Sequence, residues 1–117
     1  MYIGPDDEDR PGMVDALQSM GLTFAMADDF HEAKRILATQ PPDLLITHVR
    51  LGAYNGLHLV LRGKATNPRM AAIVVSDMAD AVLKREVEAM EATMVVKGAN
   101  RTEWIAAAQR AICREAM

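Results

Sequence analysis

Short apolar runs alternate with amphipathic segments along the chain, and this alternation constrains the fold more than any other feature. Each run has the length of a β-strand, and several are rich in β-branched residues. The segments between them repeat their apolar residues with helical spacing. The predicted strands are Met1–Ile3, Leu22–Ala27, Leu44–Thr47, Ala71–Val75 and Thr93–Val96. The sequence therefore predicts five alternations of strand and helix.

The five predicted helices carry apolar faces, and residues at their ends support the boundaries. Asp29 with Glu32, and Asn100 with Glu103, have the spacing of a capping box, while Gly21 suits the end of the first helix. The expected buried faces are Met13, Ala16, Leu17 and Met20; Ala33, Ile36 and Leu37; Leu57, Val60 and Leu61; Leu83, Val87 and Met90; and Ile105, Ala108 and Ile112.

Strands that alternate with helices form parallel sheets, because each crossover carries the chain back over one face of the sheet. The runs at Leu44–Thr47 and Ala71–Val75 are apolar nearly throughout, as expected for central strands covered on both faces. The predicted fold class is therefore α/β, a (βα)5 doubly wound, five-stranded parallel sheet with helices on both faces. Residues 1–117 are expected to form one domain.

Composition excludes several classes of protein. The chain has 13 Lys and Arg, 16 Asp and Glu and a formal net charge of −3, without a polybasic tract, which argues against direct nucleic-acid binding. No apolar run approaches the roughly 20 residues that span a bilayer, and the start resembles no signal peptide, so a cytoplasmic setting without membrane contact is expected. Cys113 is the single cysteine and is expected to be a packed thiol.

Ligands of open parallel sheets bind outside the carboxyl ends of the strands. The residues expected there are Asp6 and Asp7 after the first strand, His48 after the third, Ser76 after the fourth and Lys97 after the fifth. Carboxylates suit a divalent cation, while a lysine and a hydroxyl suit phosphoryl oxygens.

Three stretches resemble the response-regulator receiver domain of the CheY-like kind. ADDFHEAKRILATQPPDLLITHVRLGAYNGLHLV resembles its second helix, third strand and following loop, AAIVVSD the strand that ends in a hydroxyl residue, and MVVKGAN the strand that ends in a lysine. The resemblance covers nearly the whole chain and implies a flavodoxin-like sheet with strand order 2-1-3-4-5.

The resemblance also implies a role in two-component phosphorelay signalling. Receivers of this kind accept a phosphoryl group from a histidine kinase on an aspartate at the end of the third strand. Acids after the first strand hold Mg²⁺. The fourth helix, fifth strand and fifth helix then present the change to a protein partner, and a homodimer is also compatible with the resemblance.

The match departs from the family pattern at the reacting residue. His48 stands where the resemblance puts the phosphoacceptor aspartate, and a neutral imidazole cannot form an acyl phosphate or offer Mg²⁺ a carboxylate. Ser76 and Lys97 match the hydroxyl and lysine positions. Met94 stands in place of the aromatic switch residue, and Gly98 replaces the proline that usually follows the lysine.

The acidic pair after the first strand has two alignments. Placing Asp6 and Asp7 at the metal-binding positions requires a short deletion before Gly21, whereas an ungapped alignment places Gly4 and Pro5 there. The ungapped alignment is favoured because it keeps the first helix in phase. Asp6 and Asp7 then form a solvated acidic turn, no metal site remains, and Mg²⁺ is expected only if the two acids reach the pocket.

A packed or hydrogen-bonded role is favoured for His48. A zinc site would need three or four ligands, and His31 and His58 lie on predicted helices that have no reason to converge with it. A pH-sensitive role and direct contact with a partner remain as alternatives for His48, since imidazole titrates near neutrality.

The favoured function is a receiver without its phosphoacceptor, a non-enzymatic and phosphorylation-independent protein-interaction module. Met78 and Met94 are candidates for its exposed face, and Trp104 is expected to be packed. One alternative is a receiver phosphorylated at an unorthodox site, for which Asp77 is a weak candidate because it belongs to a turn. The other is a small ligand-binding or enzymatic flavodoxin-like domain, although no phosphate loop, nucleophile elbow or triad is visible.

Overall fold

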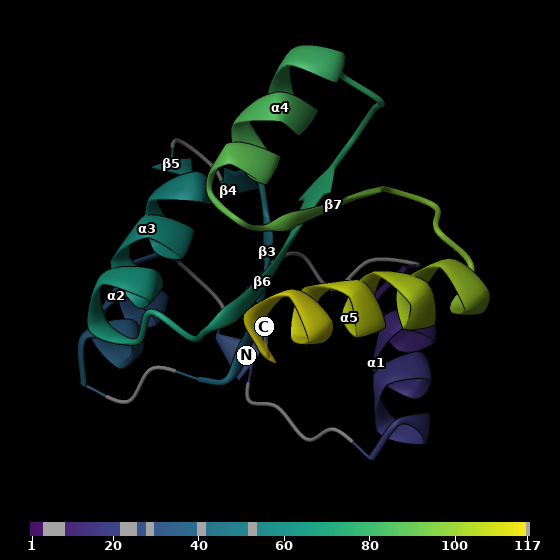
Figure 1. The fold of residues 1–117 in the computed structure, drawn as a ribbon, viewed down its shortest axis with the longest axis horizontal. Helices are drawn as coiled ribbons and strands as arrows, with labels where there is room; N and C mark the ends of the chain where they lie inside the picture. The colour runs from purple at the N-terminus through teal and green to yellow at the C-terminus, as the bar shows by residue number, and fades with distance from the viewer. Residues whose placement is uncertain (4–8, 22–25, 28–29, 40–41, 52–53, 117) are drawn as a thin grey trace.

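The computed structural model describes residues 1–3, 9–21, 26–27, 30–39, 42–51 and 54–116 (Figure 1). Strands and helices alternate along these ranges, with a short pair of extra strands before the third helix. The elements are β1 (Tyr2–Ile3), α1 (Asp9–Ser19), β2 (Met26–Ala27), α2 (Phe30–Thr39), β3 (Leu44–His48), β4 (Arg50–Leu51), β5 (Tyr54–Asn55), α3 (Leu57–Thr66), β6 (Ala71–Ser76), α4 (Ala81–Ala89), β7 (Thr93–Val96) and α5 (Arg101–Ala116).

Five parallel strands form the main sheet in the order β2-β1-β3-β6-β7. Numbered among the parallel strands alone, this is the order 2-1-3-4-5, so the predicted fold class and strand order are confirmed. β3 and β6 pair along five residues at the centre, with Ile46 opposite Ile73 and His48 opposite Val75. The part of the second predicted strand before Met26 lies outside the described residues.

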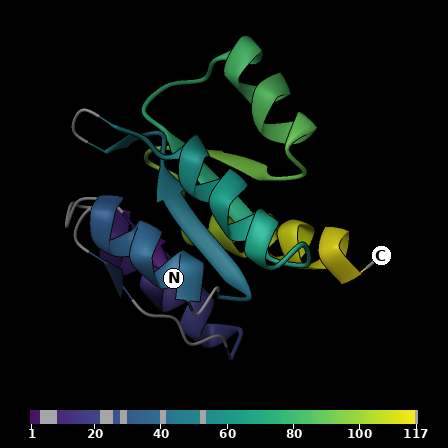
Figure 2. The same cartoon turned by 90° about the vertical axis from the view of Figure 1, so that its left-hand side faces the viewer.

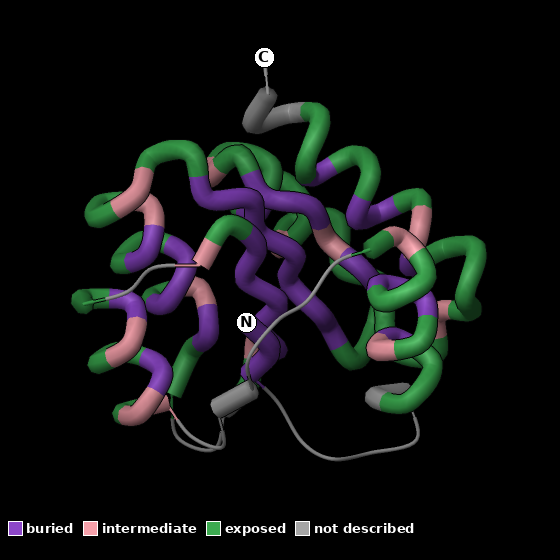
Figure 3. The backbone as a smooth tube through the Cα atoms, turned by 90° about the horizontal axis from the view of Figure 1, so that it is seen from below, coloured by how far each residue is buried: buried purple, intermediate pink, exposed green. Residues whose placement is uncertain are grey.

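Helices cover both faces of this sheet. Ile46 and Ile73 pack in a cluster with α1 and α5, whereas Leu45 and Val74 pack in a second cluster with α2, α3 and α4. The alternation follows from the two-residue side-chain period of a strand. Figure 3 shows the buried backbone running through the middle of the molecule. Each fully buried aliphatic side chain contributes about 1.5–3 kcal/mol, so the central strands supply much of the stability.

The predicted buried faces are correct for α1 and α2 but shifted in α3. Met13 and Leu17 in α1, and Leu37 in α2, are fully enclosed. In α3 the buried residues are Leu59, Val60 and Gly63, while Leu61, which was expected in the core, is 57% exposed. One residue rotates a helix by about 100°, so neighbouring leucines in this apolar segment cannot all face the sheet.

The predicted face of α5 is also displaced. Its buried residues are Trp104, Ala107, Ala108 and Ala111, whereas Ile112 is 36% exposed. Cys113 is exposed, so the prediction of a packed thiol is wrong. The bulky indole of Trp104 fills the space against the sheet, and the small alanines let the rest of the helix approach it closely. Trp104 is packed, as predicted.

Local capping places the ends of several helices. Asn100 Oδ1 accepts a hydrogen bond from Glu103 N at 2.8 Å, and Glu103 Oε1 accepts one from Asn100 N at 3.4 Å. The predicted capping box at the start of α5 is therefore confirmed. Gly21 has a φ of +78°, which suits glycine after the end of α1. Asp29, of the other predicted box, lies outside the described residues.

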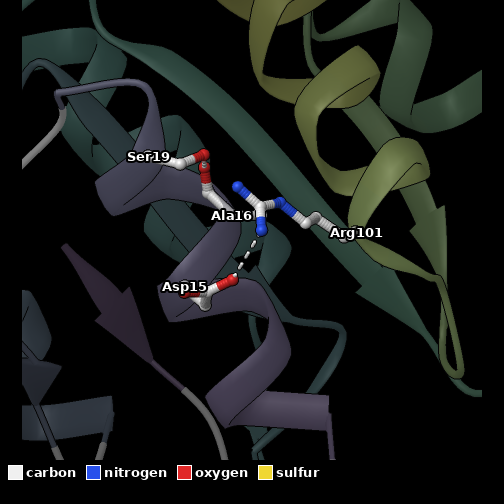
Figure 4. Close-up of polar contacts among 4 residues, drawn as sticks. All are labelled: Asp15, Ala16, Ser19 and Arg101. Atoms are coloured by element: carbon white, nitrogen blue, oxygen red, sulfur yellow. Dashed lines mark hydrogen bonds and ion pairs between the residues drawn. The ribbon is translucent and has the colours of Figure 1, made fainter.

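A surface ion pair joins α1 and α5 (Figure 4). Arg101 Nη1 lies 3.2 Å from Asp15 Oδ2, and both side chains are more than half exposed. Nearby, Ser19 Oγ donates to the Ala16 carbonyl within α1 at 2.6 Å. Exposed ion pairs contribute at most about 1 kcal/mol, so these two helices associate mainly through their apolar residues.

A two-stranded antiparallel hairpin follows β3 and was not predicted. Arg50 of β4 pairs with Asn55 of β5, and Gly56 N donates to the Val49 carbonyl at 2.7 Å. Asn55 Oδ1 then accepts from Leu57 N at 2.8 Å, which turns the chain into α3. Strands of two residues have no periodic signal, so the sequence indicated only a loop here.

Gly56 is required by close packing and not by its backbone angles, because its φ is −61°. A Cβ atom added there would lie 2.0 Å from the His48 carbonyl oxygen and 2.6 Å from Thr47 Oγ1. The Gly56→Ala substitution should therefore destabilise the protein by about 3 kcal/mol through overpacking. Urea unfolding measures this loss as a lower midpoint at unchanged slope.

Gly63→Ala is the matched control for that measurement. A Cβ atom at Gly63 meets Met70 Cε at 2.5 Å, Met70 Sδ at 2.6 Å and Leu37 Cδ2 at 3.2 Å, all side-chain atoms, and methionine is unbranched and adaptable. Alanine also favours the helix, so the loss should stay below about 1 kcal/mol. If the two variants lose the same unfolding free energy, the close approach to the His48 carbonyl oxygen is not the reason that position 56 requires glycine.

Removing the helix cap at Asn100 should lower the unfolding free energy by less than the Gly56→Ala substitution does. The Asn100→Ala substitution leaves the Glu103 amide at the exposed start of α5 without its side-chain acceptor, and we expect a loss of about 1 kcal/mol in unfolding free energy. Asn100→Ser, which keeps an oxygen acceptor, should recover most of it. A loss below the error of the urea experiment would contradict a stabilising cap.

Candidate functional site

The carboxyl ends of β3 and β6 lie side by side and open onto a cavity of about 580 Å³. His48 is the last residue of β3 and Ser76 the last residue of β6. The cavity is lined by His48, Val49, Arg50, Val75, Ser76, Asp77, Met78, Asp80, Val82, Leu83 and Glu86. Parallel pairing thus brings two of the predicted site residues to one cavity.

His48 is buried against Tyr2 of the neighbouring strand β1. Its Nε2 lies 3.0 Å from Tyr2 Oη, in hydrogen-bond contact, and the two rings meet edge to face with centroids 5.8 Å apart and an interplanar angle of 82°. His48 is 7% exposed and Tyr2 2%. The histidine is therefore packed and hydrogen-bonded, as predicted.

Tyr2 was missed as the partner of His48. The alternation of side chains along a strand could have revealed the contact. Tyr2 pairs with Ile46, and His48, two residues after Ile46, points to the same face of the sheet. A buried phenol usually finds a hydrogen-bond partner, and the imidazole provides one. The register that reveals this contact exists only once β1 is paired with β3.

Ser76 closes the turn after β6. Its Oγ donates to the Met78 carbonyl at 2.7 Å and accepts from Met78 N at 3.4 Å. Asp77, the weak candidate for phosphorylation, is exposed beside it. Asp80 was not singled out in the sequence, although its spacing before α4 is typical of an N-cap. Its Oδ1 accepts from Val82 N and Leu83 N at 3.0 and 3.1 Å.

Lys97 lies in the turn after β7. Its backbone amide donates to the Ser76 carbonyl at 2.7 Å, and Gly98 follows with a φ of +92°. The side chain of Lys97 is exposed, and it is not among the described residues that line the cavity. The structure therefore brings His48 and Ser76 to one cavity and places the backbone of Lys97 next to Ser76. Asp6 and Asp7 lie outside the described residues, as do Gly4 and Pro5.

The sequence model of the response regulator receiver domain family matches residues 6–109. The chain belongs to this family. A search of curated protein sequences found no match. Members of the family are generally signalling modules without enzymatic activity of their own, and they interact with partner proteins.

Solved receiver structures share this architecture. A CheY-like receiver domain protein from Methanospirillum hungatei JF-1 has a TM-score of 0.81 at 15% identity, covering 98% of this chain and 93% of its own. Chemotaxis response regulator CheY4 of Vibrio cholerae has a TM-score of 0.78 at 20% identity, and the match covers 94% of each chain. A two-component transcriptional regulator AraC from Clostridium phytofermentans ISDg has a TM-score of 0.73 at 26% identity. The match covers 97% of this chain and 90% of that protein's chain.

No three His, Cys, Asp or Glu side chains gather into a possible metal site within the part of this receiver domain that the structure describes. His31 lies at the start of α2 and contacts Phe30 and Tyr54, while His58 lies on α3. Of the described helices, none combines the length and apolar content that crossing a membrane requires.

The region of α4 and β7 carries exposed apolar side chains. Met78 is 70% and Val82 65% exposed, and Met94 of β7 is half-buried. Met94 also lines a second hollow of about 460 Å³, together with Ala79, Asp80, Ala81, Lys84 and Val96. Met78 is thus exposed as predicted, whereas Met94 is only partly so because it packs against the core beneath α4.

The contact of Tyr2 with His48 should be measurable as a coupling between the two side chains. We expect a double-mutant cycle of Tyr2→Phe and His48→Leu, followed by urea unfolding, to give an interaction free energy of about 1 kcal/mol. Additive losses from the two substitutions would show that the hydrogen bond contributes nothing to stability.

Proposed function

We propose that this receiver domain acts without phosphorylation, as a non-enzymatic regulatory module that binds a protein partner. The observation that carries the proposal is His48, a buried imidazole at the end of β3, hydrogen-bonded to Tyr2. In this proposal His48 occupies the position of the phosphoacceptor aspartate. Residues 1–117 then form a single receiver domain, and its expected cytoplasmic setting stays a prediction.

The chemistry of phosphoryl transfer supports this assignment. An aspartate accepts the group by attack of a carboxylate oxygen on phosphorus, which forms an acyl phosphate, and an imidazole has no such oxygen. Phosphorylation of Nε2 would have to replace the hydrogen bond to Tyr2 and fit a charged group into a site that is 7% exposed. Burying that charge costs free energy unless cations and hydrogen-bond donors compensate it.

The residues around His48 also support the proposal. Ser76 and Lys97 are proposed to match the hydroxyl and lysine of the family, yet the Ser76 hydroxyl donates to the Met78 carbonyl. Asp6 and Asp7 would hold Mg²⁺ only if they reach this pocket, and the favoured alignment puts Gly4 and Pro5 at those positions.

The hairpin after β3 is held against α2, which supports a domain that keeps one conformation. The rings of Phe30 and Tyr54 stack with centroids 4.5 Å apart and an interplanar angle of 8°. His31 Nε2 lies 3.0 Å from Tyr54 Oη. Without a covalent modification, only a ligand that binds one state better than another can shift the conformation.

The proposed partner surface is the face formed by α4, β7 and α5. Exposed Met78 and Val82, with Val96 at the edge of the second hollow, offer apolar contact area next to the charged Lys84. Met94 is proposed to stand at the switch position, where a flexible thioether replaces a ring. The proposed occupant is another protein, and a homodimer through this face is the alternative.

Intact-mass measurement tests whether the domain can be phosphorylated. We expect no gain of a phosphoryl group when the domain is incubated with acetyl phosphate and Mg²⁺ and its intact mass is measured at neutral pH. A receiver domain that has the aspartate, treated in parallel, verifies the reagent. The Ser76→Ala variant, expected to behave like the parent protein, controls for reaction at the cavity hydroxyl.

Two kinds of mass gain would overturn the proposal, and their stability tells them apart. A gain that is lost in alkali indicates an acyl phosphate on a carboxylate such as Asp77. A gain that is lost in acid but persists in alkali indicates a phosphorylated histidine, and the His48→Gln variant then shows whether His48 carries it.

Self-association at the α4–β7–α5 face has a separate test. Sedimentation equilibrium of the purified domain should give the monomer mass, because the proposed occupant is a different protein. A dimer that the Val82→Glu substitution dissociates would make a second copy of the chain the occupant. Val82 is 65% exposed, so this substitution should leave the melting temperature nearly unchanged.

A further inference from the structure

A separate groove of about 390 Å³ lies between α2 and α3, away from the cavity at His48. Figure 2 looks onto this side of the molecule, with α2 in blue and α3 in teal. The groove is lined by Phe30 and Lys34 from α2 and by His58, Leu59, Leu61, Arg62 and Ala65 from α3. Its lining combines exposed apolar side chains with cations.

Leu61 is the most exposed large apolar residue of this groove. It is 57% exposed although its spacing predicted a core position, so the side chain leaves a large apolar surface facing water. Phe30 forms another wall and is held in place by its stack with Tyr54. A wall that is already fixed loses little conformational entropy when a ligand binds.

Charge is distributed unevenly around the groove. Lys34 and Arg62 are exposed on opposite helices, and no Asp or Glu is among its described lining residues. The segments α2 and α3 together carry four Lys and Arg (Lys34, Arg35, Arg62 and Lys64) and one acid, Glu32. The whole chain, in contrast, has 13 basic and 16 acidic residues. Asp28 and Asp29 lie outside the described residues.

We propose that the α2–α3 groove binds an acidic peptide segment of a partner protein. An apolar side chain of the peptide packs on Leu61 and Phe30, and its carboxylates pair with Lys34 and Arg62. A peptide fits better than a nucleic acid because the groove exposes an aliphatic surface and the protein as a whole is acidic. This binding is independent of phosphorylation and uses a different surface from α4, β7 and α5.

Peptide selection tests the proposal without a known partner. A random peptide library is displayed on phage and selected against the folded domain, and the enriched peptides are then synthesised with a fluorescent label. We expect Asp and Glu to be enriched beside a leucine or aromatic residue. Binding measured by fluorescence anisotropy should weaken as salt is raised, because exposed charges are screened.

Variants of exposed residues locate the binding site. Leu61→Gln and the double variant Lys34→Glu with Arg62→Glu should each weaken binding about tenfold or more, through lost packing and through repulsion respectively. Arg69→Glu is the matched control, since Arg69 is an exposed cation between α3 and β6, outside the groove lining and outside the α4–β7–α5 face, and it should change the affinity less than about twofold. Circular dichroism melting checks that each variant is folded.

Four results would overturn the groove as an acidic-peptide site. The first is enrichment of peptides without acidic residues, and the second is failure to enrich any peptide whose binding the groove variants weaken. The third is binding of a labelled DNA or RNA oligonucleotide that these variants abolish. The fourth is self-association that they abolish. The proposed function stands or falls by the mass experiment instead. A phosphorylated domain that still binds acidic peptides in the groove would remove the first proposal and keep the second.

Discussion

The pairing of β3 with β6 is the constraint on which the rest of the structure depends. All five residues of β3 and all six of β6 are buried, so helices must cover both faces of these strands. A shift of the register by one residue would exchange the two side-chain faces and disrupt both cores. Because the strands are parallel, the same pairing brings His48 and Ser76 to one edge of the sheet.

His48 and Ser76, the polar residues at that edge, are both buried. At the end of β3, the rings of His48 and Tyr2 pack edge to face and share a hydrogen bond beside the cavity. The Ser76 hydroxyl is likewise occupied within its own turn. Both polar groups at this edge thus have hydrogen-bond partners within the domain.

The sequence predicted the strands and the faces of α1 and α2 well, because their apolar residues have one consistent spacing. It failed for α3 and α5, whose segments contain more apolar or small residues than one face can hold. Which sector of such a helix is buried depends on how it crosses the sheet, and Leu61 and Ile112 therefore became exposed. The hairpin of β4 and β5 was missed because its strands are two residues long.

The sequence by itself determined the order of the elements, the parallel sheet and the presence of a histidine at the end of its third strand, since these follow from local periodicity and residue identity. Only the tertiary structure decided that Tyr2 contacts His48, that the Lys97 amide donates to the Ser76 carbonyl and that Leu61 faces water. Such contacts join residues far apart in the chain, and they are set by strand register and helix rotation rather than by local sequence.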